Sequence, residues 1–426
     1  MSTALLTDRY ELTMLQAALR SGRANRRCVF EVFSRQLPSG RRYGVLAGTG
    51  RVLEAIQDFR FSEAEISWLE SEKVVNSETL NWLANYKFSG DVRGYAEGEI
   101  YFANSPVMTV EGSFAEAVVL ETVILSILNF DSAVASAAAR MHSVAQGRRL
   151  VEMGGRRAHE QAAVAAARAA YIAGFDSTSN LEAGRQWGIP TMGTSAHSFT
   201  LLHDTEREAF KAQLDSMGVE TTLLVDTFNV DEAVRTAVEL AGPNLGAVRI
   251  DSGDLTDNAK RVRALLDSLG ASKTRITVTS DLDEYAIAAL AAAPVDGYGV
   301  GTSLVTGSGF PTAGFVYKLV SHSDGGEWVD VAKTSKSKTN RGGEKFAYRK
   351  LSGGKAVAEV IAMEPNADLG RELQVSLVTD GKLHQEFLGT SGVARARAHH
   401  AKVIKELPES ALRLSKGEGA LAMEIG

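Results

Sequence analysis

Between residues 220 and 305, the sequence alternates short aliphatic or β-branched runs with helical patterns. The runs are TTLLVD (221–226), GAVRID (246–251), RITVTSD (275–281) and DGYGVG (296–301), and they recur about every 25 residues. The stretches between them, such as VDEAVRTAVELAG, have the apolar spacing of amphipathic helices. Strands and helices that alternate in this way form βαβ units and therefore a parallel sheet. Units of this size fit either a doubly wound sheet or an α/β barrel.

Three of these predicted strands end in an aspartate. The residues are Asp226, Asp251 and Asp281. The carboxyl ends of parallel strands form the ligand face of α/β folds, so repeated carboxylates there suggest a site for hydroxyl groups and metal ions. The alternative is that each aspartate caps the helix that follows it, which is a common role for Asp. The three together favour a site.

The composition limits the kinds of partner that the chain can have. It has 426 residues, with 46 Lys plus Arg against 52 Asp plus Glu, and a net charge of −6 with neutral histidines. This length accommodates about two or three domains. A general nucleic-acid binder needs a basic face that displaces counterions, so the negative balance argues against that class. We expect small molecules or other subunits as partners.

Several features predict a soluble, cytoplasmic protein. The single cysteine, Cys28, excludes an intramolecular disulfide and a cysteine-based zinc site, which fits a reducing compartment. The first residues lack the basic and apolar regions of a secretory signal.

Residues 116–150 predict one or two helices, with a possible break at 129–131. The apolar run 118–130 is shorter than the ~20 residues that a membrane span needs, so we expect no membrane partner.

Two segments carry residue types suited to binding phosphate. The turn 299–303 follows the fourth predicted strand, and its glycines let backbone N–H groups approach an anion while Thr302 and Ser303 add hydroxyl donors. An ordinary turn is the alternative. Arg156 and Arg157 follow two glycines and suit a guanidinium clamp for phosphate or carboxylate. The alternative for this pair is a solvated helix start.

Two further candidates come from side-chain direction and local sequence. Arg249 precedes Asp251 by two residues, so both side chains point to the same face of the predicted sheet. This cation and anion form either an ion pair or a two-sided site. His197 follows a glycine and two hydroxyl residues in GTSAH. A lone histidine is more often structural than catalytic, so these residues alone favour a structural role for it.

With these residues assembled, the chain resembles the nicotinate phosphoribosyltransferase family over nearly its whole length. Eight stretches occur in family order, and together they are highly specific. They are TDRYELTM (7–14), FEVFSRQLPSGRRYGVLAG (30–48), MGGRRAHEQAAVAAARAAYIAGFDSTSN (153–180), GTSAHSF (193–199), VRIDSGDL (248–255), SDLDEY (280–285), GVGTSLVT (299–306) and FVYKLV (315–320). The resemblance implies an irregular α/β barrel at 116–325 and a second α/β domain built from the N- and C-terminal segments, 1–115 and 326–426.

The resemblance also implies a reaction. The family joins nicotinate to 5-phosphoribosyl 1-diphosphate, giving nicotinate mononucleotide and pyrophosphate for NAD biosynthesis, with Mg²⁺ and coupled ATP hydrolysis, as an ATP-dependent ligase. His197 matches the histidine that ATP phosphorylates, and this implication outweighs the structural alternative. Asp251 matches the carboxylate beside the ribose and its metal, and Gly301 with Thr302 matches the turn for the 5-phosphate. Tyr10 matches a tyrosine that stacks on the pyridine ring from the partner subunit of a homodimer with shared active sites.

The remaining positions concern the choice of base. Thr194 and Arg249 match nicotinate-site positions, and Arg156 and Arg157 match the basic pair near the carboxylate and phosphates. The nearest rival is a nicotinamide phosphoribosyltransferase, in which an Asp that accepts from the amide aligns with Asn180. Asn can donate to a carboxylate whereas Asp repels one, so Asn180 favours nicotinate.

Some positions depart from the family pattern, and one further rival remains. Met153 stands where nicotinamide-using relatives place an aromatic residue, and Arg341 replaces an expected proline in the loop 333–345. In that loop, a solvated hairpin and a phosphate contact by Lys336 or Lys338 are about equally expected.

The rival from another class is a noncatalytic phosphate-sensing barrel. It predicts drift at the chemistry-bearing positions, yet the matched histidine, arginine and aspartate are present.

Overall fold

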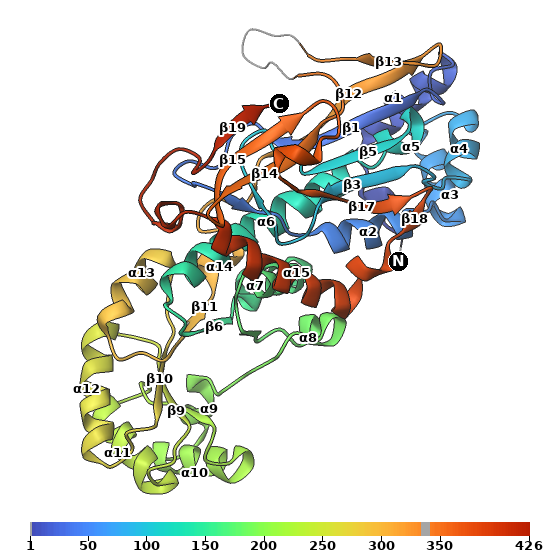
Figure 1. Cartoon of the computed structure of the whole chain (residues 1–426). Coiled ribbons are helices and arrows are strands. Elements are labelled where there is room, and N and C mark those ends of the chain that lie inside the picture. Colours follow the sequence, from blue (N-terminus) through green and yellow to red (C-terminus); the bar gives the residue numbers. More distant parts are fainter. Residues whose placement is uncertain (1, 334–340) are drawn as a thin grey trace. The chain divides into compact units, whose positions relative to one another are not determined.

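The computed structural model describes residues 2–333 and 341–426, and these residues form two compact units (Figure 1). Unit 1 combines Met1–Ser136 with Phe310–Gly426, and unit 2 is Ala137–Gly309. As the resemblance implied, one unit is built from both ends of the chain. The division falls after Ser136 and after Gly309, whereas the sequence placed it near 115 and 325.

In the described residues of unit 2, six parallel strands form one curled sheet in the order β7-β6-β11-β10-β9-β8. The strands are β6 (Arg149–Glu152), β7 (Ser177–Thr178), β8 (Thr222–Leu224), β9 (Ala247–Ile250), β10 (Arg275–Val278) and β11 (Gly297–Val300). Because the last strand pairs with the first, the order is circular and is interrupted between β7 and β8. The sheet is therefore an open half-barrel and not a doubly wound sheet.

The helices of unit 2 fill the connections between these strands. They are α7 (Glu160–Ile172), α8 (Leu181–Trp187), α9 (His197–Leu202), α10 (Glu206–Met217), α11 (Val230–Ala241), α12 (Leu255–Ser268), α13 (Glu284–Ala289) and α14 (Thr302–Val305). The predicted βα rhythm between 220 and 305 is confirmed by β8 to β11 and the helices between them (Figure 1).

The caps of α11, α12 and α13 decide between the two interpretations of the strand-end aspartates. The side chains of Asn229, Asp254 and Asp283 accept the backbone N–H groups at the starts of these helices. The aspartates at 226, 251 and 281 stand two or three residues earlier and cap none of the three helices. The capping alternative is therefore wrong for all three aspartates.

Unit 1 has a sheet of its own in the part of the chain that the structure describes. Its order is β13-β12-β1-β5-β3-β17-β18, and every neighbouring pair is antiparallel. The strands are β1 (Arg27–Ser34), β3 (Asp91–Tyr95), β5 (Met108–Ser113), β12 (Phe315–Asp324), β13 (Glu327–Asp330), β17 (Gln374–Thr379) and β18 (Lys382–Leu383). Smaller sheets are formed by β2 (Gly44–Val45) with β4 (Ile100–Tyr101), and by β16 (Arg371–Glu372), β14 (Phe346–Ser352), β15 (Lys355–Ala362) and β19 (Ala422–Ile425).

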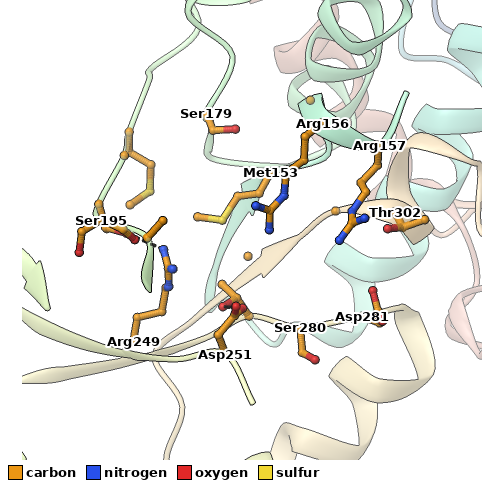
Figure 2. Close-up of a pocket in the computed structure, with 18 residues that line it drawn as sticks. Met153, Arg156, Arg157, Ser179, Ser195, Arg249, Asp251, Ser280, Asp281 and Thr302 are labelled. Carbon is orange, nitrogen blue, oxygen red and sulfur yellow. Dashed lines mark hydrogen bonds between the residues drawn. The ribbon is translucent and has the colours of Figure 1, made fainter. Parts of the chain in front are cut away.

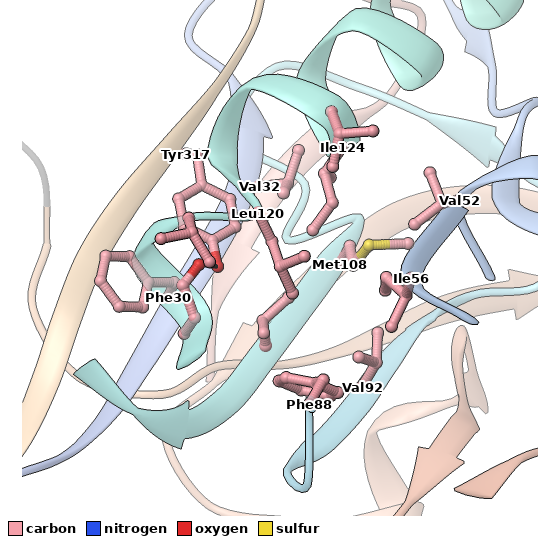
Figure 3. Packing of buried hydrophobic residues seen from close by; sticks show 14 of the residues in the cluster. Phe30, Val32, Val52, Ile56, Phe88, Val92, Met108, Leu120, Ile124 and Tyr317 are labelled. Carbon is pink, nitrogen blue, oxygen red and sulfur yellow. Dashed lines mark hydrogen bonds between the residues drawn. The ribbon is translucent and has the colours of Figure 1, made fainter. Parts of the chain in front are cut away.

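The helices of unit 1 pack their apolar side chains on the large sheet (Figure 3). They are α1 (Arg9–Arg20), α2 (Thr49–Asp58), α3 (Glu63–Ser71), α4 (Ser77–Ala84), α5 (Phe114–Val118) and the first part of α6 (Glu121–Val144). α15 (Gly389–Val403) belongs to the same unit and contacts α2. Phe30 of β1 stacks on Tyr317 of β12 with ring centroids 4.8 Å apart. The Tyr317 hydroxyl donates to the buried carbonyl of Ala117 at 2.9 Å, which satisfies its polar end.

One helical segment of the chain is longer than the sequence indicated. Phe114–Val144 is long and apolar enough to cross a membrane by length and composition, and 67% of its most apolar window is buried inside the protein. α6 runs through the expected break at 129–131 without interruption. The expectation that the apolar run is too short is therefore wrong. The core helix of a soluble protein can have the same length and composition. Such a helix is mostly buried, as this one is.

A buried ionic network lies in unit 1 around Glu99, which is fully buried. Arg371 donates to its carboxylate at 2.8 Å, and Nε2 of His399 lies 3.0 Å from the same oxygen. Burial alone would raise the pKa of Glu99, but the hydrogen bonds from His399 and Arg371 outweigh it and lower the pKa to about 2. The charged form of this carboxyl is therefore part of the folded state.

Candidate active site

A cavity of about 550 Å³ opens at the carboxyl ends of the half-barrel strands, entirely within unit 2 (Figure 2). Its lining comes from the segments that follow β6, β7, β10 and β11, from β9, and from the loop before α9. The lining residues are Met153, Gly155, Arg156, Arg157, Ser179, Met192, Gly193, Thr194, Ser195, Ala196, Arg249, Asp251, Thr279, Ser280, Asp281, Gly299, Gly301 and Thr302. The ligand face that the sequence predicted is thus a real cavity.

Most of the residues singled out in the sequence lie in this cavity. They are Arg156, Arg157, Thr194, Arg249, Asp251, Gly301 and Thr302. Figure 2 shows the two neighbouring arginines pointing into the cavity from one wall, with Arg249 and Asp251 on the opposite wall. The lining therefore combines cationic groups with a carboxylate, as a ligand with both anionic groups and hydroxyls requires.

Arg249 is the most buried cation of the cavity wall. Its Nη1 donates to Thr194 Oγ1 at 2.5 Å, and its buried Nε has no hydrogen-bond partner among the described residues. Burial lowers the pKa of the guanidinium and Arg156 acts in the same direction, while Asp251 and Asp226 oppose the shift. A buried donor without an acceptor is costly, so this Nε is suited to an anionic ligand group.

A hydrogen-bonded chain links the cavity to His197. The Thr279 hydroxyl donates to Oδ1 of Asp251, and the backbone N–H of Asp251 donates to Oδ2 of Asp226 at 2.8 Å. Ser252 Oγ donates to the same oxygen at 2.6 Å. The remaining oxygen, Oδ1 of Asp226, lies 3.2 Å from Nε2 of His197. Asp226 therefore holds the imidazole and the strand end that carries Asp251.

His197 is the first residue of α9 and stands beside the cavity, immediately after its lining residue Ala196. Its side chain is 40% exposed, whereas that of Asp226 is 3% exposed. A carboxylate at Nε2 favours the tautomer that carries its proton there, which leaves the lone pair on Nδ1. The histidine is thus held in one orientation and still reaches solvent and ligands.

Besides His197, two predicted residues do not line this cavity. Tyr10 lies on α1 in unit 1 with 43% of its surface exposed, and burial of the hydroxyl followed by the charge of Glu121 raises its pKa to about 12. Asn180 does not line the cavity; its side chain caps α8 by accepting from Ala183 N at 3.0 Å. The roles that the resemblance implied for both remain predictions. Lys336 and Lys338 lie outside the described residues.

Sequence reasoning missed several lining residues. Ser280 adopts φ +145°, a conformation rare for a residue with a side chain, directly after the strand end. Thr279 holds Asp251, Ser179 comes from the loop after β7, and Met192 comes from the loop before α9. A signal was present for Ser280 and Thr279, since both belong to the strand-end segment RITVTSD, and for Ser179, which stands in the family stretch 153–180. The sequence offered none for Met192.

The described residues contain no group of three or more His, Cys, Asp or Glu side chains placed to hold a metal ion. Asp251 and Asp281 both line the cavity. Mg²⁺ is commonly held by one or two carboxylates together with substrate phosphates and water. The two aspartates fit this arrangement, provided that a phosphate-bearing ligand supplies the other oxygens.

Two family models match the sequence. The nicotinate phosphoribosyltransferase N-terminal domain matches residues 5–129, and the nicotinate phosphoribosyltransferase family matches residues 148–364. The chain is 52% identical to nicotinate phosphoribosyltransferase pncB1 of Mycobacterium tuberculosis over 98% of this chain and 94% of that protein. It is 37% identical to the nicotinate phosphoribosyltransferase of Bacillus subtilis, over 82% of this chain and 73% of that protein.

Solved structures agree with the sequence matches. The crystal structure of human nicotinic acid phosphoribosyltransferase superposes with a TM-score of 0.82 at 26% identity, covering 98% of this chain and 97% of that chain. The nicotinate-nucleotide pyrophosphorylase from Pyrococcus furiosus superposes with a TM-score of 0.77 at 23% identity, covering 94% of each chain. The second similarity bears on the fold alone.

Proposed function

The chain belongs to the nicotinate phosphoribosyltransferase family, and we propose that it couples phosphoribosyl transfer to ATP hydrolysis through a phosphohistidine at His197. Phosphoribosyl transfer to nicotinate, in NAD salvage, is the function that this membership gives. The coupling places the protein in the ATP-dependent ligase class. The observation that carries the proposal is the 3.2 Å contact between His197 Nε2 and the buried Asp226, which also accepts from the backbone of Asp251 in the cavity.

The proposal assigns each part of the two substrates to a group of cavity residues. Arg249 and Thr194 would receive the nicotinate carboxylate, since the free Nε of the arginine is buried there. The backbone and hydroxyl at Gly301 and Thr302 would bind the 5-phosphate at the end of β11. Asp251 would accept from the ribose hydroxyls, and with Asp281 it would hold Mg²⁺ on the diphosphate. Bound there, Mg²⁺ would neutralise the charge of the leaving pyrophosphate.

The transfer itself needs positioning more than proton chemistry. The lone pair of the pyridine nitrogen forms the new bond to the anomeric carbon while the bond to pyrophosphate breaks, through an oxocarbenium-like state. The nitrogen carries no proton, so no general base is required. Arg156 and Arg157 point into the cavity and would stabilise the negative charge that grows on the leaving group (Figure 2).

The phosphohistidine step uses the geometry around His197. The Nδ1 lone pair attacks the γ-phosphorus of ATP, the bond to the bridging oxygen breaks, and ADP leaves. Asp226 accepts a hydrogen bond from Nε2–H, and its negative charge stabilises the positive charge that the ring gains while the proton stays on Nε2. Water later hydrolyses the N–P bond. While it lasts, the phosphoryl group places negative charge beside the cavity, and we infer that this change in substrate affinity drives the synthesis forward.

The remaining expectations belong to the same proposal. A homodimer would bring Tyr10 of one subunit to the pyridine ring in the other, and the 43% exposed phenol is accessible for such a contact. The partners are nicotinate, the diphosphate sugar and ATP, with no nucleic acid or membrane. A cytoplasmic location, with Mg²⁺ available, suits all three substrates.

Labelled ATP tests the proposal. Incubation with γ-³²P-labelled ATP and Mg²⁺ should leave acid-labile, base-stable phosphate on the wild-type protein and none on His197→Ala. The same variant should still make nicotinate mononucleotide without ATP stimulation. Wild-type protein that stays unlabelled, with synthesis unaffected by ATP, would refute the role of His197.

The choice of base is tested separately. Assays with nicotinate and nicotinamide should show a clear preference for nicotinate, because the cavity wall presents cationic donors to a carboxylate. Asn180 supports the preference less directly than the sequence suggested, since its amide oxygen caps α8. A preference for nicotinamide would assign the cavity to the rival reaction.

A further inference from the structure

Glu152, the last residue of β6, is fully buried and directly precedes the lining residue Met153. Burial raises the pKa of its carboxyl, and only hydrogen bonds oppose the shift. Within residues 2–333 and 341–426 it forms no ion pair with a lysine or arginine. A buried carboxyl without a cation is costly for the fold, so its presence here calls for a reason other than stability.

The two carboxyl oxygens of Glu152 serve different walls of the cavity. Oε1 accepts the backbone N–H of Gly154, at the start of the turn that carries the two arginines. Oε2 accepts the hydroxyl of Thr178 at 2.5 Å, and the same hydroxyl oxygen accepts the backbone N–H of Asn180 at 2.9 Å. The backbone carbonyl of Glu152 accepts from Ser179, a lining residue, at 2.9 Å. One side chain therefore connects the ends of β6 and β7.

The turn held by Glu152 is also packed tightly against the third wall. A Cβ atom at Gly154 would lie 2.2 Å from Cγ1 of Val305 and 3.1 Å from the carbonyl oxygen of Gly301. Only glycine fits between these groups and Oε1 of Glu152, which would be 3.0 Å from that Cβ. A shift of Gly154 would therefore be transmitted to the turn at the end of β11.

We propose that Glu152 is a positioning residue for phosphoribosyl transfer: it fixes the turn that carries Arg156 and Arg157 relative to the wall formed by Ser179. Glu152 touches neither substrate and acts through Gly154 and Thr178. The inference rests on the phosphoribosyltransferase activity, and it does not depend on ATP coupling or on His197.

Glu152→Gln is the direct test. Glutamine has the same shape but one acceptor, so either Gly154 N–H or the Thr178 hydroxyl loses its partner. We expect KM for nicotinate and for the diphosphate sugar to rise roughly tenfold, about the loss of one charge-assisted hydrogen bond, with kcat changed less than about twofold. The melting temperature should change little, because the cost of leaving one donor without an acceptor is offset by removal of a buried acid that has no cation partner.

Two matched variants separate positioning from general destabilisation. Thr178→Val removes the hydroxyl that donates to Glu152 and should raise both KM values, whereas Thr178→Ser keeps the hydroxyl and should restore them. Glu97→Gln is the control in unit 1, where a buried carboxylate accepts from Gly48 N at 2.6 Å and Gly50 N at 3.1 Å. It should lower stability and leave both KM values unchanged.

The outcomes are distinct. Raised KM values with an unchanged melting temperature, reproduced by Thr178→Val, support the proposal. Wild-type KM values in Glu152→Gln, or a loss of activity that follows a loss of stability as in the Glu97 control, overturn it. Wild-type protein that makes no nicotinate mononucleotide would instead contradict the activity on which the inference rests.

Discussion

Asp226→Asn removes the carboxylate that holds His197. The two groups are 3.2 Å apart. Asparagine carries no charge and has one acceptor oxygen, so with that oxygen on the Asp251 N–H, which donates at 2.8 Å, the strand end keeps its hydrogen bond while Nε2 loses both its acceptor and the charge beside it. At that separation, a full charge is worth about 5 kcal/mol at an effective dielectric of ~20 and about 1 kcal/mol in water. Because the imidazole is 40% exposed and the carboxylate 3% exposed, an intermediate value of about 2 kcal/mol is appropriate. It corresponds to roughly 30-fold slower phosphorylation.

The assay is single-turnover labelling by γ-³²P-labelled ATP under rapid quench, with uncoupled synthesis of nicotinate mononucleotide measured in parallel. Labelling should slow while uncoupled synthesis changes less than about threefold, since the strand end that carries Asp251 keeps its hydrogen bond. Ser252→Ala is the control, because it removes a 2.6 Å hydrogen bond to the same carboxylate without removing charge. Labelling of Asp226→Asn at the wild-type rate, or equal slowing in Ser252→Ala, would refute the reasoning.

Three further predictions concern the cavity and the stability of the two units. Gly299→Ala places a Cβ 2.5 Å from a side-chain carbon of Thr279. It should lower the free energy of unfolding in urea by about 1–3 kcal/mol and raise KM for the diphosphate sugar. Unchanged stability and an unchanged KM would contradict this packing. Arg140→Ala removes a buried 3.0 Å ion pair with Glu284 and should lower the free energy of unfolding by about 3–5 kcal/mol, because it leaves a buried carboxylate without its cation. The double variant with Glu284→Gln should lose less stability, because it also removes that charge. The pKa of Glu99 is lowered from 4.5 to about 2. Its ionised carboxylate therefore contributes about 3 kcal/mol to the free energy of unfolding above pH 4.5, and this contribution is lost as the pH falls toward 2. Glu99→Gln should flatten this acid limb of the curve of stability against pH.

The sequence predicted much of the cavity because the periodicity of a parallel sheet places strand ends together. Asp251, Arg249 and the turn at Gly301 and Thr302 lie there, as their positions after β-branched runs indicated. Ser280 stands at such a strand end too, but its φ of +145° could not be predicted, because that conformation is not a local preference of serine.

Two residues show where sequence spacing fails. Asn180 directly follows the lining residue Ser179, yet its side chain caps α8, where it satisfies a backbone N–H of the first turn that has no partner within the helix. Glu152 had no motif around it, and only the folded chain shows that it accepts from both Gly154 and Thr178. The contact with Thr178 joins residues 26 positions apart, and no sequence period predicts it.

By itself, the sequence determined the α/β class, the strand and helix segments from 220 to 305, and the family, because apolar periodicity and motif order are local properties of the chain. Tertiary structure decided that the sheet is a half-barrel interrupted between β7 and β8, and that Asp226 turns from its strand end to His197 instead of capping α11. Strand pairing and buried hydrogen bonds depend on which segments meet in space. The sequence therefore identifies the groups, and the fold sets the contacts through which they act.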